Sequence, residues 1–130
     1  MINKLDKESV IGISALLVHA ANIDEIYSEH EKDLIKDFIR SYLKDEDASK
    51  ILEKSEKIER NSNQLLNYTN IIKQNSMEIK KDIIEHLWKV IISDKTVDQY
   101  ESNLMRRICG LIYFPDKECG EIKLKLINKK

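Results

Sequence analysis

Apolar residues recur at helical spacing in successive stretches of the chain. In the first stretch Val10, Ile13, Leu17 and Ala21 lie three or four residues apart, which predicts a buried helix from about Asp6 to Asn22. Further apolar stripes follow after polar breaks. They predict a second helix from Ser28, a third after the acidic residues 45–47, a fourth over 65–72, a fifth from the N-cap Ser76 to about Ser93, a sixth from Asp98 to Phe114-Pro115, and a seventh from about Asp116. The pattern predicts an all-α domain of about seven helices.

Composition supports this prediction and excludes other classes. The chain has 130 residues with only one Pro and three Gly, too few for the many tight turns of a β-sandwich or barrel. Hydrophobic residues make up 42%, which is too many for a disordered tail, while the short apolar runs argue against membrane insertion. Residues 1–130 are therefore expected to form one domain. Gly12, Gly110 and Gly120 all fall in helical stretches, and close helix packing is one reason to expect them there.

The balance of charges gives no reason to expect a nucleic-acid partner. Lys and Arg number 22 against 23 Asp and Glu, so no concentrated basic face suggests nucleic acid. The four lysines near the end (123, 125, 129 and 130) fit a solvated helix face.

No secretion signal is visible, and the cytoplasm is the expected compartment. Cys109 and Cys119 form no disulfide framework or zinc pattern, and Cys109 is expected to be a buried, inert thiol on an apolar stripe.

An internal repeat emerges when the chain is shifted by 70 residues. The fifth and sixth helices then align with the first and second. The aligned pairs include Leu17 with Leu87, Asp24 with Asp94, Ser28 with Asp98, Glu31 with Glu101, and Leu34 with Leu104. Both halves have acidic residues at the same point between two apolar helices. The pattern predicts two related helical units, at about 10–60 and 80–130.

The acidic residues of these two turns have a purely structural interpretation. Ser28 with Glu31, and Asp98 with Glu101, have the spacing of a capping box. In that motif the first side chain accepts a hydrogen bond from the N3 amide, while the glutamate accepts one from the N-cap amide. Each cap stabilises a helix by about 1 kcal/mol. Capping alone would explain these four residues.

Asp24 and Asp94 are not explained by capping, and they suggest a metal site. Each lies four residues before a predicted cap, where its carboxylate could meet the glutamate of the next helix. If the two units are related by an approximate two-fold axis, Asp24, Glu31, Asp94 and Glu101 could converge. Oxygen ligands of this kind suit Ca²⁺, Mg²⁺ or Mn²⁺. Asp98 and His19 are weaker candidate ligands, and both interpretations of the turns stay open.

Catalytic patterns are missing from the sequence. It has no His-Glu-x-x-His zinc motif, no Gly-rich phosphate loop and no nucleophile elbow. The three histidines are best interpreted as surface or half-buried imidazoles, and Trp88 as a core residue. We expect no enzymatic activity.

Three segments of the chain resemble one known family. LLVHAANIDEIYSEHEKDLI, LWKVIISDKTVDQYESNLMRRICGLI and FPDKECGEIKLKL are similar to the TerB-like helical domain, whose superfamily includes the N-terminal domain of the membrane co-chaperone DjlA. The resemblance covers about Val10 to Leu126. It implies an all-α fold of two similar units, a cytoplasmic place in stress- or envelope-associated assemblies, and no known catalysis. It also implies that Asp24, Glu31, Asp94 and Glu101 hold a metal ion.

This chain departs from the family pattern at four positions. Glu25 and Lys95 stand where the family usually has Gly, and His19 and Lys89 stand where it often has Glu. The two lysines place positive charge beside the second acidic turn and weaken the prediction of a metal there. The alternative is a helical interaction module with an unidentified protein partner or a second copy of the chain, in which the acids only cap helices.

Overall fold

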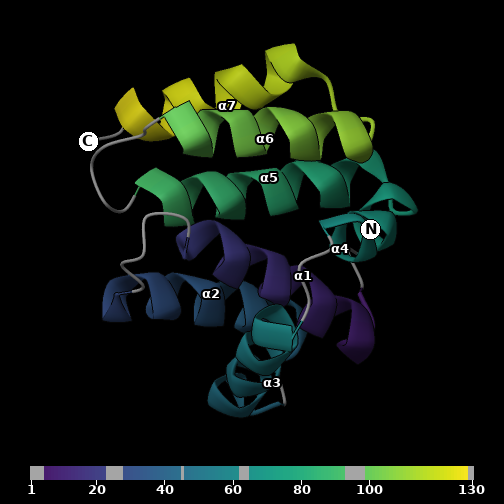
Figure 1. Ribbon diagram of the computed structural model, residues 1–130, viewed down its shortest axis with the longest axis vertical. Coiled ribbons are helices and arrows are strands. Elements are labelled where there is room, and N and C mark those ends of the chain that lie inside the picture. Colours follow the sequence, from purple (N-terminus) through teal and green to yellow (C-terminus); the bar gives the residue numbers. More distant parts are fainter. Residues whose placement is uncertain (1–4, 23–27, 45, 62–64, 93–98, 129–130) are drawn as a thin grey trace.

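The fold is a bundle of α-helices. A computed structural model describes residues 5–22, 28–44, 46–61, 65–92 and 99–128. These residues contain no β-strand and form seven helices (Figure 1): α1 (Lys7–Ala21), α2 (Glu29–Tyr42), α3 (Ala48–Asn61), α4 (Leu65–Lys73), α5 (Met77–Ile92), α6 (Gln99–Leu111) and α7 (Asp116–Asn128). The predicted all-α fold and its helices are confirmed.

Local hydrogen bonds explain where several helices begin. Asp6 accepts the Ser9 N–H at 2.7 Å as the N-cap of α1, and this bond lowers the pKa of its carboxyl group. Ser76 Oγ accepts the Ile79 N–H at 3.3 Å just before α5. Because these bonds involve residues three apart, the sequence alone could predict them.

Helices α1 and α5 form the centre of the molecule. Helix α1 packs against α2, α3, α4 and α5, while α5 also packs against α2, α4 and α7. From Val10 to Ala21, every residue of α1 is buried or half-buried. Such an apolar helix has no solvated side because neighbours cover it all round. Figure 1 shows α1 and α5 between α2 below and α6 and α7 above.

The core residues of α5 and α6 fit the predicted stripes. Trp88 is only 3% exposed, as expected for a core residue, and Ile83, Ile84 and Leu87 are fully buried beside it along α5.

A side-chain hydrogen bond joins α3 to α1. Ser55 Oγ donates to the Ile11 carbonyl at 3.0 Å. The buried hydroxyl proton of Ser55 therefore has an acceptor at the contact between the two helices.

The glycines differ in their surroundings. A Cβ at Gly12 would lie 2.6 Å from Ile71 Cδ1, so α1 and α4 approach closely there. A Cβ at Gly110 or Gly120 would meet no atom within 4 Å. The expectation of close packing is correct for Gly12 and wrong for the other two, because their Cα atoms face open space.

Helix α6 ends in a Schellman turn that leads into α7. The Phe114 N–H donates to the Cys109 carbonyl at 2.8 Å, and the Tyr113 N–H donates to the Gly110 carbonyl at 3.4 Å. Tyr113 has φ 61°, the left-handed conformation that this turn requires. The chain reverses there, Pro115 follows, and α7 packs against both α5 and α6.

Candidate functional site

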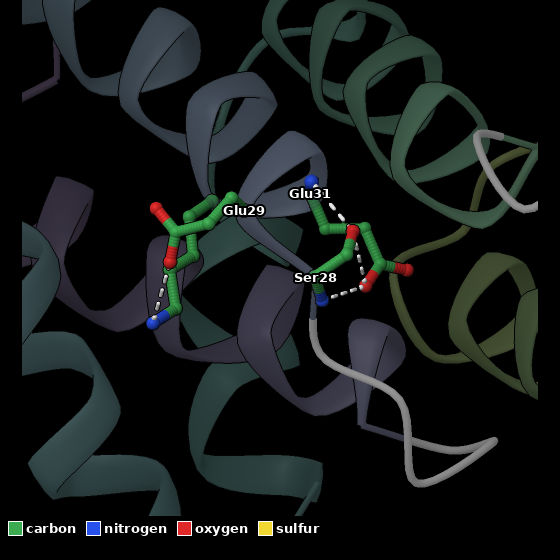
Figure 2. A network of polar contacts seen from close by, with 4 residues as sticks. Ser28, Glu29 and Glu31 are labelled. Atoms are coloured by element: carbon green, nitrogen blue, oxygen red, sulfur yellow. Dashed lines mark hydrogen bonds and ion pairs between the residues drawn. The ribbon is translucent and has the colours of Figure 1, made fainter.

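The first acidic turn leads into α2 through a complete capping box. Ser28 Oγ accepts the Glu31 N–H at 3.1 Å, and Glu31 Oε1 accepts the Ser28 N–H at 2.8 Å (Figure 2). The Ser28 hydroxyl also donates to the same carboxylate oxygen at 3.3 Å. The capping box predicted for this turn is confirmed, and it fixes the orientation of the Glu31 side chain.

Burial distinguishes Glu31 from other carboxylates. It is 1% exposed, and it is the one buried carboxylate among the residues that the structure describes. Burying a charge is costly without hydrogen bonds or an opposite charge. Its neighbour Glu29 is exposed and pairs with Lys32 at 3.4 Å, on the other side of the helix start in Figure 2. The sequence spacing predicts the cap but not this burial.

The other predicted ligands have no described side chain. Asp24, Asp94 and Asp98 lie outside the described residues, as does the predicted second cap. Glu101 lies in α6, and its side chain is also outside them. Within the described part, no three His, Cys, Asp or Glu side chains are grouped so that they could hold a metal ion. The convergence of Asp24, Glu31, Asp94 and Glu101 therefore stays a prediction.

His19, the weaker candidate ligand, contacts a residue that the sequence did not suggest. Its Nδ1 lies 3.4 Å from Glu59 Oε2 on α3, and Asn22 Nδ2 donates to Glu59 Oε1 at 3.3 Å. Both contacts join the last turn of α1 to the last turn of α3. Glu59 lies 40 residues from His19 along the chain, so no local spacing could have identified it.

A family comparison agrees with the resemblance noted in the sequence. The family model described as "Tellurite resistance protein TerB" matches residues 11–124. The match runs from α1 into α7 and covers most of the chain. The chain belongs to the TerB family. Neither the curated proteins nor the solved structures gave a match to this TerB domain.

None of the described helices of the TerB domain is both long enough and apolar enough to cross a membrane.

A second polar group of the TerB domain joins α2 to α5. Tyr42 Oη donates to Asp82 Oδ2 at 2.7 Å, and His86 Nε2 lies 3.6 Å from Asp82 Oδ1. The Phe38 ring meets the His86 ring edge-on, with 5.1 Å between the ring centres. Burial lowers the pKa of His86, although Asp82 opposes this shift. Tyr42 and His86 lie on different helices, so the sequence analysis missed the group.

The three histidines have the predicted surroundings. His30 is exposed at the start of α2, while His19 and His86 are half-buried. Lys89, which replaces a family glutamate, is exposed in the last turn of α5 and contributes to lowering the pKa of His86. Its positive charge therefore acts on an imidazole one turn earlier in the same helix.

Proposed function

We propose that this TerB domain is a non-catalytic cytoplasmic module that binds a divalent cation, Ca²⁺, Mg²⁺ or Mn²⁺, through its acidic turns. One observation carries the proposal: the Glu31 carboxylate is 1% exposed at the entrance to α2. A capping glutamate can perform its role at the surface. This carboxylate is instead buried and held in a fixed orientation, and its oxygens are ligands of the kind that a divalent cation prefers.

The proposed ligands are Glu31 and Asp24 from the first turn, with Asp94 and Glu101 from the second. Ser28 supports the binding role of Glu31, because its two hydrogen bonds hold Oε1 in place before any ion arrives. Carboxylate oxygens suit hard divalent cations. A cation would also neutralise the repulsion among four acidic groups. The Lys89 and Lys95 departures predict weaker binding in the second half.

Thermal unfolding of the chelator-treated protein tests cation binding. We expect Ca²⁺, Mg²⁺ or Mn²⁺ to raise the Tm, and saturation at 100 times the Kd corresponds to about 2.7 kcal/mol. For a domain of this size, that is a shift of roughly 10 °C. Glu31→Gln should remove most of the shift, since the amide oxygen still caps the helix but carries no charge.

Glu29→Gln is the matched control. Glu29 lies in the same first turn, but it is exposed and paired with Lys32. The control should keep the full response to the cation, and Asp24→Asn should lose it. An equal loss in both glutamate variants, or no response of the wild-type protein to any of the three ions, would contradict the proposal.

A helical interaction module is the second candidate function, with the acids acting as caps only. The complete capping box at Ser28 favours it, as does the outer side of α7, where Leu124 is 58% and Ile127 39% exposed. Leu124 also lines a hollow of about 620 Å³ beside Lys81. In this proposal, a protein partner or a second copy of the chain covers that side within a stress- or envelope-associated assembly.

Native mass spectrometry distinguishes the second candidate. If copies of the chain associate through α7, a dimer should form with wild-type protein and disappear with Leu124→Glu. Lys117→Glu, which changes the charge of an exposed α7 residue that does not line the hollow, is the control. A monomer at all concentrations would exclude the second copy as the partner.

A further inference from the structure

The two cysteines meet where α5, α6 and α7 pack together. Cys109 on α6 is fully buried, and Cys119 on α7 is 5% exposed. Trp88 on α5 donates its indole N–H to Cys119 Sγ at 3.3 Å. The Schellman turn at Tyr113 returns the chain from α6 to α7, and the two thiols lie close enough to shift each other's pKa. Both are free thiols.

One of the two thiols, that of Cys119, lies beside a hollow. Cys119 lines a hollow of about 450 Å³ together with Trp88, Arg106, Asp116 and Lys123. The Lys123 ammonium lies 5.3 Å from the centre of the Trp88 ring, and this half-buried lysine therefore packs partly over the indole. The expectation that the lysines of α7 form a purely solvated face is therefore wrong for Lys123. A small polar molecule in the hollow would meet the cationic side chains of Arg106 and Lys123 and the carboxylate of Asp116, while Met105 and Cys119 are the two sulfur-containing residues that line it.

The surroundings shift the pKa values of the two thiols in opposite directions. The hydrogen bond from Cys109 lowers the pKa of Cys119, assisted by the Trp88 indole and the Lys123 charge, while burial and Asp116 oppose the shift. The same hydrogen bond, together with burial, raises the pKa of Cys109. Cys119 is therefore the first of the pair to form a thiolate, and Cys109 keeps its proton.

We propose that Cys119 is an oxidation site for hydrogen peroxide, and that Cys109 captures the oxidised sulfur in an intrachain disulfide. The Cys119 thiolate attacks one peroxide oxygen, the O–O bond breaks, and the departing hydroxide takes up a proton to become water. The sulfenic acid on Cys119 is then attacked by the Cys109 sulfur. An S–S bond forms, the S–O bond breaks, and the second water leaves with the Cys109 proton.

Two features of the site support this order of events. The hollow offers peroxide a route to Cys119, whereas Cys109 is fully buried and does not line this hollow. A buried thiol beside a sulfenic acid reacts with it before a second peroxide does, which stops oxidation at the reversible stage. The disulfide would join α6 to α7 and disturb the bond from Trp88, which is the one tryptophan of the chain.

Peptide mass mapping of the peroxide-treated, full-length protein tests the proposal. We expect one disulfide-linked peptide pair that contains Cys109 and Cys119, with a loss of two hydrogens that dithiothreitol reverses. Trp88 fluorescence should change in parallel and recover on reduction. Cys119 should react several-fold faster in the folded chain than in the chain unfolded by guanidinium, because only the fold supplies its three pKa-lowering partners.

Variants separate the two thiol roles. In Cys109→Ser, dimedone should trap a sulfenic acid on Cys119, and in Cys119→Ser the remaining thiol should stay reduced. Trp88→Phe should slow the reaction of Cys119 while keeping an aromatic ring in the core. Met77→Leu is the control: it removes an exposed, oxidisable side chain that is more than 30 residues from either cysteine, and it should not change the rate at which the disulfide forms.

Three outcomes would overturn the proposal. The first is a wild-type protein whose thiols remain fully alkylatable after peroxide treatment. The second is faster oxidation of the unfolded chain than of the folded chain. The third is a disulfide that links two chains instead of joining α6 to α7. Each can be measured on the wild-type protein, so the test does not depend on whether a core variant folds.

Discussion

Gly12 and Gly110 look alike in the sequence but have different roles in the folded chain. Each interrupts an apolar helical stripe. A Cβ at Gly12 would lie 2.6 Å from Ile71 Cδ1, whereas one at Gly110 would meet nothing within 4 Å. A methyl group at the first glycine would displace the Ile71 side chain, whereas the second glycine only lowers the stability of α6.

Gly110→Ala should therefore stabilise the protein by up to about 1 kcal/mol, since alanine restricts the unfolded chain and adds no clash. Gly12→Ala should stabilise it less or destabilise it, because Ile71 must move. Urea unfolding of both variants provides the measurement. Equal gains would show that α1 and α4 have room for a methyl group.

The candidate site was predictable only to the extent that its contacts are local. The capping box joins Ser28 and Glu31, which are three residues apart, so the sequence spacing predicts it. The burial of Glu31 depends on which helices surround the start of α2. The pairing of His19 with Glu59 depends on how α1 crosses α3. Neither arrangement leaves a periodic signal in the sequence.

At the scale of elements, backbone strain and a side-chain contact oppose each other at the turn between α6 and α7. Tyr113 has φ 61°, which favours glycine, and its ring is covered by the Lys73 ammonium 4.8 Å from the ring centre. A left-handed conformation costs a residue with a Cβ about 1–2 kcal/mol. An exposed cation–π contact stabilises the folded state by about 0.5–1 kcal/mol. The ring contact therefore offsets part of the backbone strain.

Replacing Tyr113 by glycine should relieve that strain. We expect Tyr113→Gly to stabilise the protein by about 0.5 kcal/mol, and by about 1 kcal/mol in a Lys73→Gln background, where no ring contact is lost. A thermal or urea unfolding cycle over the four proteins measures both values. The Schellman hydrogen bonds do not involve either side chain, so a loss of stability in both backgrounds would contradict this account.

The contact between α2 and α5 should make stability depend on pH. Burial lowers the pKa of His86 below the 6.5 of an unfolded chain. The folded protein therefore binds this proton less readily, and its stability falls as the pH decreases below about 6.5. Above that pH the imidazole is neutral in both states and contributes no further change.

His86→Gln should reduce the loss of stability between pH 7.5 and pH 5, because no imidazole remains to be protonated. Urea unfolding at the two pH values measures the difference, and His30→Gln is the control, since His30 is exposed. If His86→Gln kept the full pH dependence, another group would be responsible for it.

At the scale of the whole molecule, the central contact of α1 with α5 joins the two predicted units. Helix α1 belongs to the first unit and α5 to the second, and each has buried side chains along most of its length. Neither helix could keep its apolar surface from water if the other unit unfolded. The two units should therefore unfold as one.

Coincident transitions would confirm this cooperativity. Trp88 lies in α5 and reports on the second unit, while far-ultraviolet circular dichroism reports on helices throughout the chain. We expect both signals to give the same urea midpoint. A circular dichroism transition at lower urea, before any change in Trp88 fluorescence, would show that the first unit unfolds separately.

The sequence by itself determined the helices of this protein and the hydrogen bonds that begin them. Apolar spacing and N-caps act between residues three or four apart, so the seven helices and the caps at Asp6, Ser28 and Ser76 could be predicted. Tertiary structure decided which polar and sulfur-containing side chains meet. The pairs His19–Glu59, Tyr42–Asp82 and Trp88–Cys119 lie 31 to 40 residues apart in the chain. Those contacts follow from the way apolar faces pack, which brings distant helices together in one particular arrangement.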